Sequence, residues 1–284
     1  MTTSPQKMTK KILIIGSGFS SISAATYLAD KGYDVTIFEK NSSFGGRARK
    51  FQANGYTFDM GPSWYWMPDV FEKYFNDFDK KVSDYYNLKK LDPAYKVYFG
   101  LNDSIEIKGN LDAICETFDE YEKGASESLR KFMHEANENY SIAMDKIVYK
   151  PGISIFELVT FKTIKRVRYF LTNIKSEVAK YFKNKKLRQL LEFPVLFLGA
   201  KPENTPAFYN IMNHADFGLG TWFPETGGMY KVIESMIELA VEKKVKFKSN
   251  QNVDKIIVNG NRIKGVESNG NFFSFDIIIS GADY

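Results

Sequence analysis

The chain has 284 residues, of which 44% are hydrophobic and 26% are charged, and it carries a formal net charge of +5. This length suits one large domain or two ordinary ones, and the composition excludes disorder as a description of the whole chain. A single cysteine, Cys115, excludes a disulfide framework, and its apolar helical surroundings predict a packing role. Two histidines leave almost nothing for a metal centre, so we expect no metal site. The lack of cysteine pairs leads us to expect a reducing compartment.

The N-terminal stretch is polar, and the first apolar run, at residues 12–15, is short. A secretory signal needs an apolar stretch of about 7–15 residues. No segment approaches the roughly 20 apolar residues that span a bilayer. We therefore expect a cytoplasmic protein that does not cross the membrane.

The segment 11–39 has the pattern of a dinucleotide-binding βαβ unit. A continuous apolar run predicts a buried strand, and Gly16 and Gly18 follow it directly. Apolar residues then recur at helical spacing, and a second predicted strand, 34–38, is followed by Glu39. Strand, glycine turn, helix, strand and acidic residue together form the dinucleotide-binding fingerprint.

Each part of this fingerprint has a physical role. Gly16 permits the tight turn, and Gly18 lets the backbone approach a pyrophosphate at the helix N-terminus. Glu39 can accept hydrogen bonds from a ribose hydroxyl. Ser21 stands where the fingerprint has its third glycine, whose role is close packing of the helix against the strand. A glycine turn that is only structural is the alternative, and the acidic residue after the second strand argues against it.

A second glycine segment indicates which nucleotide is bound. Residues 44–49 read FGGRAR, and residues 55–63 read GYTFDMGPS. Gly46 and Arg47 offer another close backbone approach beside a cation that pairs with phosphate. A nicotinamide enzyme has no obvious need for this contact, whereas FAD is longer and must be held farther along. The predicted cofactor is therefore FAD, and the alternative is a glycine hairpin with solvated arginines.

These motifs resemble the FAD-dependent amine oxidase and phytoene desaturase superfamily and, more narrowly, the bacterial phytoene desaturases of carotenoid synthesis. The resemblance covers essentially the whole chain. Further matching stretches are WYW at 64–66, FPVLFLGA at 193–200, GTWFP at 220–224, GGM at 227–229 and SGAD at 280–283.

The resemblance implies where the adenosine and pyrophosphate parts of FAD bind. Gly16, Gly18 and Ser21 would hold the pyrophosphate turn, and Glu39 the adenosine ribose. The backbone of Val253 would touch the adenine.

The same resemblance implies a continuation toward the flavin. Gly46 and Arg47 would lie along the pyrophosphate and the ribityl chain. Gly61, Pro62 and Ser63 would lie close to the flavin side of the cavity.

The pattern of predicted elements changes in the middle of the chain. Short strand-like runs precede long helical stretches from 110 to about 191, and after residue 225 a helix and several short strands follow. The predicted fold class is α/β. It combines an FAD-binding Rossmann-type βαβ domain with a β-meander, at 1–65 and 225–284, and an inserted, mostly helical α+β substrate domain at 66–224.

One segment of the predicted insert is strongly basic. Residues 162–188 contain ten basic residues and one acidic residue, which gives them +9 and leaves −4 for the rest of the chain. Apolar residues at helical spacing alternate here with lysines and arginines, and such a helix can rest on an anionic membrane surface. A core helix with a solvated charged face is the alternative. Nothing else resembles a nucleic-acid-binding module, so we expect no nucleic-acid partner.

Two other features are open to two interpretations each. Trp64, Tyr65 and Trp66 could line a hydrophobic tunnel or belong to an ordinary core. His214 with Asp216 could form a proton relay, although neighbouring polar residues more often satisfy each other. No titratable residue is singled out as a catalytic acid or base.

The resemblance implies an FAD-dependent oxidoreductase that desaturates an acyclic carotenoid precursor such as phytoene, in peripheral contact with an anionic membrane surface. A hydride would pass from an allylic carbon to the flavin, and a neighbouring proton would be lost, which makes a new conjugated double bond. Other superfamily activities, such as those of a carotenoid isomerase, a ketolase or an amine oxidase, are alternatives. The positions and number of desaturation steps, the flavin re-oxidant and the oligomeric state are not indicated.

The family closes its FAD site with a second glycine-rich segment, which does not follow SGAD here. We therefore expect the chain to correspond to the N-terminal portion of a desaturase, with weak FAD binding and little turnover by itself. A truncated, inactive product is the alternative. Reading the nucleotide sequence beyond the codon for Tyr284 distinguishes the two.

Overall fold

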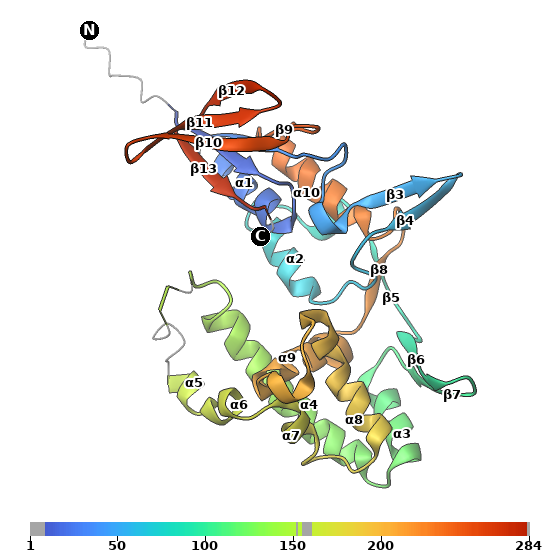
Figure 1. The fold of residues 1–284 in the computed structure, drawn as a ribbon. Helices are drawn as coiled ribbons and strands as arrows, with labels where there is room; N and C mark the ends of the chain where they lie inside the picture. Colours follow the sequence, from blue (N-terminus) through green and yellow to red (C-terminus); the bar gives the residue numbers. More distant parts are fainter. Residues whose placement is uncertain (1–8, 152, 155–160, 283–284) are drawn as a thin grey trace. The chain divides into compact units, whose positions relative to one another are not determined.

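The computed structural model describes residues 9–151, 153–154 and 161–282. The chain forms two compact units (Figure 1). The sheet unit comprises Met1–Tyr65, Phe71–Leu88 and Pro224–Tyr284, and the helical unit comprises Trp66–Val70 and Lys89–Phe223. Asp283, the last residue of the SGAD motif, lies outside the described residues.

The sheet unit is built on a parallel sheet with the strand order β13-β1-β2-β9. Its strands are β1 (Lys11–Ile15), β2 (Asp34–Phe38), β9 (Lys246–Lys248) and β13 (Ile277–Ser280). Helix α1 (Phe19–Asp30) connects β1 to β2 and packs against α10 (Tyr230–Glu242). Residues 12–14 are at most 1% exposed, as a continuous apolar run predicts for a strand that is buried on both faces.

An antiparallel meander follows β9 in the chain. Its strands are β10 (Val253–Asn259), β11 (Arg262–Ser268) and β12 (Asn271–Ser274). Gly260 and Gly270, both with positive φ, occupy the turns that the Asn-Gly pairs predicted. Val266 of β11 joins Leu13 and Phe38 in one buried apolar cluster, so the meander packs on the parallel sheet.

One segment lies in a different unit from the expected one. Residues 71–88 belong to the sheet unit, whereas we expected the insert to begin at residue 66. The reason is helix α2 (Pro68–Asn76), whose later turns pack on α1. The hydroxyl oxygens of Tyr74 and Thr26 lie 2.8 Å apart at this contact, and both side chains are buried.

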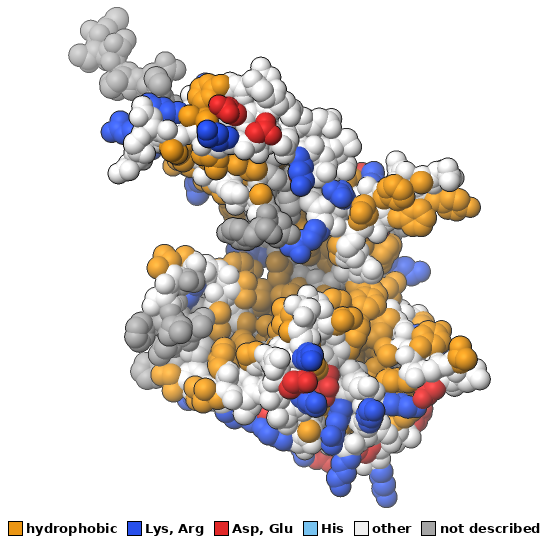
Figure 2. All heavy atoms as spheres, viewed as in Figure 1, with side chains coloured by type: hydrophobic (Ala, Val, Ile, Leu, Met, Phe, Trp, Pro, Cys, Tyr) orange, Lys and Arg blue, Asp and Glu red, His pale blue; other side chains and the backbone are white. Residues whose placement is uncertain are grey.

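A hairpin of β3 (Lys50–Ala53) and β4 (Tyr56–Asp59) carries an aromatic face. Phe51 and Phe58 are cross-strand partners, and each is 53% exposed. Tyr56 projects from the same face because side chains two positions apart along a strand share a face. Figure 2 shows hydrophobic side chains gathered over this hairpin. Its aromatic side chains therefore stay outside the core of the unit.

The helical unit starts with a two-stranded sheet and continues through helices. Its regular elements are β6 (Tyr95–Gly100), β7 (Asp103–Ile107), α3 (Leu111–Tyr121), α4 (Ala125–Lys146), α5 (Phe161–Ile164), α6 (Val167–Leu171), α7 (Ile174–Val178), α8 (Lys185–Glu192) and α9 (Ile211–Asn213). Its tighter or wider turns are η4 (Phe193–Leu198), η5 (Pro202–Asn204), η6 (Ala207–Asn210) and the π-helix η7 (His214–Gly218). Phe118, Leu129 and Phe132, at 0% exposure, lie at the centre of its core.

The helices after α4 are shorter than the sequence predicted. Asn173 and Asn184 interrupt the pattern, since their side chains accept the backbone N–H of Ser176 at 2.8 Å and of Lys186 at 2.9 Å. An asparagine in this position begins a new helix. The chain passes between the two units within β5 (Leu88–Lys90) and β8 (Trp222–Pro224), which pair with each other.

Ser21 and Gly281 make a close contact between α1 and the end of β13. Ser21 is 3% exposed, and its hydroxyl has no hydrogen-bond partner among the described residues. A Cβ built on Gly281 would come within 2.0 Å of the Ser21 Oγ. In the fingerprint, a glycine on the helix lets the helix pack closely. Here Gly281, after β13, has that role opposite Ser21 of α1.

We expect Gly281→Ala to destabilise the chain by about 1–3 kcal/mol, because the new methyl group overlaps the Ser21 hydroxyl. The double variant Ser21→Gly/Gly281→Ala should recover most of this loss, since it removes the overlapping oxygen. Urea unfolding of the single and double variants measures the coupling. Gly100→Ala is the control, because its new Cβ would approach Asp103 only to 3.7 Å. Simple additivity of the two single effects would contradict the contact.

Candidate functional site

The first glycine turn leads from β1 into α1. Gly16 has a φ of +90°, a conformation that favours glycine, and its N–H donates to the Phe38 carbonyl at 2.7 Å. Gly18, with a φ of −72°, precedes the first helical residue. A Cβ built on Gly18 would meet no described atom within 4 Å, so the space beside its backbone is open. The first turn of α1 contains no acidic residue, and a helix N-terminus of this kind favours an anion.

Glu39 follows β2 and is 4% exposed. Its Oε2 accepts hydrogen bonds from the N–H of Ser17 at 3.0 Å and from the Ser17 hydroxyl at 2.7 Å. Its Oε1 accepts the N–H of Asn41 at 3.0 Å and the Asn41 side-chain amide at 2.6 Å. Four donors therefore orient this carboxylate. Sequence reasoning identified Glu39 but missed Ser17 and Asn41, whose only signal was their polarity beside the fingerprint positions.

The second glycine segment packs directly on the first. Gly45 donates its N–H to the Ser17 carbonyl at 3.0 Å and lies 3.1 Å from the Ser17 hydroxyl oxygen. Gly46 has a φ of +59°, and a Cβ built on it would lie 3.1 Å from the Gly18 Cα. Residues 16–18 and 45–46, about 28 residues apart in the chain, thus pack backbone against backbone, and we call them the glycine cluster.

Arg47 and the segment that begins at Gly61 extend the glycine cluster. Gly61 has a φ of +94°, and a Cβ on it would lie 2.5 Å from the Arg47 carbonyl oxygen. The Arg47 side chain is exposed, Pro62 is half-buried and Ser63 is exposed. The structure thus brings Gly61 against Arg47, and it places Pro62 and Ser63 next to this contact in the chain.

Val253 begins β10 at the side of the parallel sheet. It is half-buried and packs against the apolar cluster that contains Leu13 and Phe38. Two residues earlier, the N–H of Gln251 donates to the Glu39 carbonyl at 2.8 Å. The start of β10 is therefore held beside the end of β2, where the sequence resemblance expected an adenine contact.

Asp59 joins two motifs that are far apart in the sequence. Its carboxylate accepts the N–H of Met229 at 2.7 Å and the N–H of Tyr230 at 2.9 Å, at the start of α10. Gly228, with a φ of +66°, allows this approach, because a Cβ on it would lie 2.4 Å from an Asp59 oxygen. Sequence reasoning quoted both motifs without linking them. The available signal was a helix start that lacks its own capping residue.

The aromatic stretch 64–66 is divided between the two units. Tyr65 belongs to the core of the sheet unit, at 1% exposure, and its hydroxyl lies 3.0 Å from that of Tyr86. Trp66 belongs to the helical unit, where its indole N–H donates to the Thr221 hydroxyl at 2.8 Å. The core interpretation therefore fits Tyr65.

His214 and Asp216 have separate partners. Asp216, at 3% exposure, accepts the phenol of Tyr95 and the hydroxyl of Thr221, and burial raises the pKa of Asp216 to about 7. The His214 ring instead lies 5.0 Å from the ring of Tyr140, and burial lowers the pKa of His214. The structure does not join the two residues in a proton relay.

The basic segment 162–188 is partly neutralised within the helical unit. Arg166 pairs with Glu135, and Arg168 lies 3.6 Å from the same carboxylate. Arg168 also lies 3.4 Å from the carboxylate of Glu177, which is 1% exposed. These arginines therefore act as structural cross-links between α4, α6 and α7.

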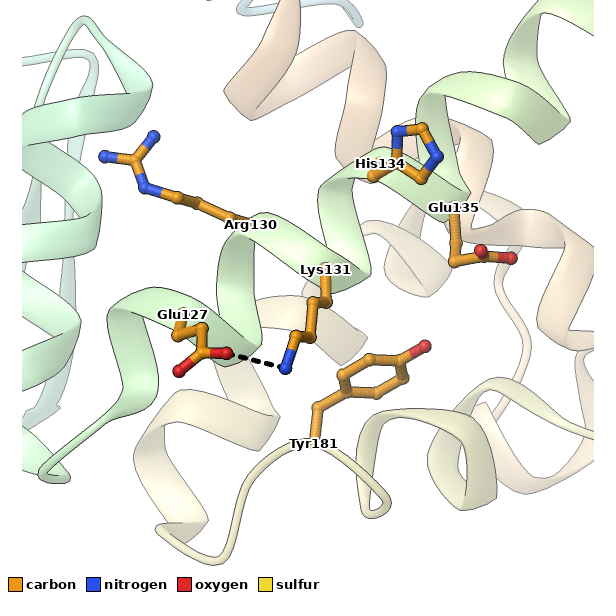
Figure 3. A pocket seen from close by; sticks show the side chains of 6 residues that line it. All are labelled: Glu127, Arg130, Lys131, His134, Glu135 and Tyr181. Carbon is orange, nitrogen blue, oxygen red and sulfur yellow. Dashed lines mark ion pairs between the residues drawn. The ribbon is translucent and has the colours of Figure 1, made fainter.

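An open hollow of about 490 Å³ lies along α4 in the helical unit (Figure 3). It is lined by charged side chains and one tyrosine: Glu127, Arg130, Lys131, His134, Glu135 and Tyr181. Glu127 pairs with Lys131 at 2.7 Å, and Arg130 pairs with Asp112 at 2.8 Å. Because carboxylates and cations neutralise one another here, the hollow lacks the chemistry of a cofactor site.

Among the described residues, no group of three or more His, Cys, Asp or Glu side chains could hold a metal ion. Within the same part of the chain, no helix is both long enough and apolar enough to cross a membrane. Cys115 is buried and free, and burial raises the pKa of its thiol, which fits the predicted packing role.

The chain is similar to proteins of known activity. It is 40% identical over 248 residues to the carotenoid 3,4-desaturase of Haloarcula japonica, an alignment that covers 86% of this chain and 50% of the relative. It is 28% identical over 277 residues to the zeta-carotene-forming phytoene desaturase of Myxococcus xanthus, which covers 96% of this chain and 53% of the relative. The chain thus spans about half the length of the curated relatives it matches.

The solved structure of cyclohexylamine oxidase from Brevibacterium oxydans matches with a TM-score of 0.54 at 17% identity, over 95% of this chain and 57% of the other. This likeness supports the predicted α/β fold class. The family model described as flavin containing amine oxidoreductase matches residues 20–284, which include the second glycine segment and Glu39 but begin after the first glycine turn. The chain therefore belongs to the flavin containing amine oxidoreductase family.

Proposed function

We propose that this chain forms part of an FAD-dependent oxidoreductase that desaturates an acyclic carotenoid. The observation that carries the proposal is the 40% identity to a carotenoid 3,4-desaturase over 86% of the chain. The phytoene desaturase relative, aligned over 96% of the chain, supports the same substrate class.

The geometry of the glycine cluster supports FAD as the flavin. The open space beside Gly18 suits a pyrophosphate at the N-terminus of α1, and the oriented carboxylate of Glu39 suits a ribose hydroxyl. Gly46 and Arg47 continue the same backbone surface, as a cofactor longer than a mononucleotide requires. Val253 would contribute its backbone on the adenine side.

The reaction needs little acid–base chemistry from these residues. FAD, when bound, supplies a hydride acceptor. The substrate would lose a hydride from an allylic carbon and a proton from the neighbouring carbon, and the electron pair of the second C–H bond would form the new double bond. The hydride and the proton would both be taken up in the two-electron reduction of the bound flavin. The protein would orient the polyene and exclude water.

The α5–α6 segment supports contact with a membrane surface that contains such a substrate. Ile164 is 56% exposed, Val167 is 50% exposed and Leu171 is 79% exposed. The neighbouring Arg166 and Arg168 turn to acidic partners within the unit. Aliphatic side chains that face solvent beside a basic segment suit an anionic lipid surface.

Product analysis tests the proposed reaction. The complete open reading frame that contains this coding sequence should be expressed in cells that accumulate phytoene and, separately, in cells that accumulate lycopene. We expect new carotenoids with longer conjugation, seen as absorption at longer wavelength, in at least one strain. Products only from the lycopene strain would indicate desaturation at the ends of the polyene. Unchanged carotenoids in both strains, with FAD bound to the purified protein, would contradict desaturation.

We expect Gly18→Ala to weaken FAD binding at least about tenfold, because the methyl group occupies the space that a pyrophosphate needs. The thermal unfolding temperature without FAD should change little, since the new Cβ meets no described atom within 4 Å and the φ of −72° suits alanine. Fluorescence titration with FAD measures the affinity, and Gly100→Ala serves as the control. Equal affinities of Gly18→Ala and the parent chain would count against this placement of the pyrophosphate.

We expect Leu171→Asp to lower co-flotation of the chain with phosphatidylglycerol vesicles about tenfold, because a charged side chain replaces an apolar one at the lipid contact. Leu101→Asp is the matched control, since Leu101 is fully exposed in the β6–β7 turn of the same unit. Equal flotation of both variants and the parent chain would sink the membrane proposal.

A further inference from the structure

A chain of hydrogen bonds in the helical unit ends at a tryptophan. The indole N–H of Trp66 donates to the Thr221 hydroxyl at 2.8 Å, and this hydroxyl donates to Asp216 at 3.2 Å. The other Asp216 oxygen accepts the phenol of Tyr95. Thr221 is 0% exposed and Asp216 is 3% exposed, so water does not compete strongly for these bonds. The single proton of the Thr221 hydroxyl goes to the carboxylate, which leaves its oxygen free to accept the indole.

The same side chains are also connected through their rings. Trp66 meets Phe197 edge-on, with centroids 5.3 Å apart and an interplanar angle of 88°. Phe197 lies 5.6 Å from Phe193, which lies 6.0 Å from Tyr95. The hydrogen-bond chain and the ring chain therefore begin and end at the same two residues, Trp66 and Tyr95. Together the two chains of contacts form a closed ring, which we call the circuit and which consists of Trp66, Thr221, Asp216, Tyr95, Phe193 and Phe197.

The circuit presents an apolar surface. Phe197 is 52% exposed, and its neighbours Leu196 and Leu198 are 67% and 54% exposed. The polar atoms of Trp66 and Tyr95 are used within the circuit. The outward side is therefore aromatic and aliphatic, which suits a hydrocarbon.

Burying a carboxylate beneath an apolar surface costs free energy. Removing a charge from water costs free energy unless donors replace the water, and the donors to Asp216 among the described residues are two neutral hydroxyls. Asp216 lies in the π-helix η7, a local geometry that often accompanies functional sites. Gly218 permits this turn, because a Cβ on it would lie 2.5 Å from the ring of His214.

We propose that Asp216 is a positioning residue, which acts through Thr221 to hold the Trp66 indole edge-on to Phe197 and so shapes an aromatic surface for the polyene chain of the substrate. This role rests on the proposed function for its ligand. The arrangement of Trp66 itself can be measured without any substrate.

Tryptophan emission of the 284-residue chain tests the positioning. The difference between the parent chain and Trp66→Phe isolates the signal of Trp66. Thr221→Val keeps the shape of the side chain and removes the acceptor of the indole N–H, and Thr221→Ser keeps the acceptor. We expect Asp216→Asn and Thr221→Val to change the Trp66 emission maximum and Thr221→Ser to preserve it.

Thr205→Val is the matched control. Thr205 is also a buried threonine of the helical unit, and its hydroxyl donates to the Lys201 carbonyl at 3.0 Å, outside the circuit. A Trp66 signal that responds equally to Thr205→Val and Thr221→Val, or that ignores Asp216→Asn, would overturn the positioning role.

The pH dependence gives a second readout. Burial raises the pKa of Asp216 to about 7, so the carboxyl is protonated at pH 5 and ionised at pH 9. The arrangement in which it accepts two hydroxyls belongs to the ionised form, and the hold on Trp66 should weaken as the pH falls through 7. The titratable groups nearby are those of Tyr95, His214 and Lys90. Burial raises the pKa of Tyr95 well above its usual range and lowers the pKa of His214. The Lys90 side chain packs beside Gly220.

We expect the Trp66 emission of the parent chain and of His214→Gln to change between pH 6 and pH 8, and that of Asp216→Asn to stay constant. A transition that disappears in His214→Gln and persists in Asp216→Asn would assign it to the histidine and overturn the role of Asp216.

Binding of an acyclic conjugated pentaene hydrocarbon, presented in detergent micelles, tests the ligand. Its absorption overlaps tryptophan emission, so binding quenches the protein. We expect Asp216→Asn and Thr221→Val to lower the affinity measured by quenching about fivefold, which is the effect of one lost hydrogen bond. Thr221→Ser and Thr205→Val should have the affinity of the parent chain. Equal quenching by all variants would overturn the positioning role alone. No quenching of the parent chain would overturn the polyene ligand and count against the proposed function.

Discussion

The sheet unit depends on how closely backbone can approach backbone at the carboxyl ends of its parallel strands. Gly46 lies against Gly18, Gly61 against the carbonyl of Arg47, and Gly281 against Ser21, and a Cβ at each position would lie within 3.1 Å of a neighbouring atom. No side chain fits between these segments. The surface that results is made of N–H groups, carbonyls and Cα atoms, and it recognises a ligand by shape and by hydrogen bonds. This is why the assignment of a cofactor rests on glycines and on one carboxylate, rather than on catalytic acids or bases.

Much of the sheet unit could be predicted because its signals are local. A continuous apolar run indicated β1, helical spacing indicated α1, and Asn-Gly pairs indicated the turns of the meander. Glu39 could be identified because its distance from Gly16 is a property of the βαβ unit. The donors that orient Glu39 could not, since Ser17 reaches it across a turn whose geometry the sequence does not reveal.

Tertiary contacts explain what local patterns missed. Asp59 caps α10 from 170 residues away, so no window of sequence contains both partners. Residues 71–88 join the sheet unit through contacts such as that of Tyr74 with Thr26, which a division by composition overlooks. In the basic segment, helical spacing predicted one amphipathic helix, but the structure divides it into α5, α6 and α7, and it buries Ile174 while Leu171 stays 79% exposed. Arg166 and Arg168 pair with half-buried or buried carboxylates of the same unit. Periodicity indicates a face of a helix, but the partners of that face decide whether it is inside.

The carboxylates of the chain illustrate how the donors around an acid decide what the acid can do. Glu39 accepts two bonds at each oxygen, and Asp59 accepts two backbone N–H groups at a helix start, where the helix dipole favours a negative charge. Glu177 lies beside two cations, Arg168 and Lys180. Asp216 has two neutral hydroxyls, and burial therefore raises its pKa to about 7. A proton can enter or leave this group near neutral pH, and the bonds that reach Trp66 through Thr221 change with it. In the helical unit, two hydrogen bonds thus link the charge state of Asp216 to the orientation of Trp66 in the aromatic surface.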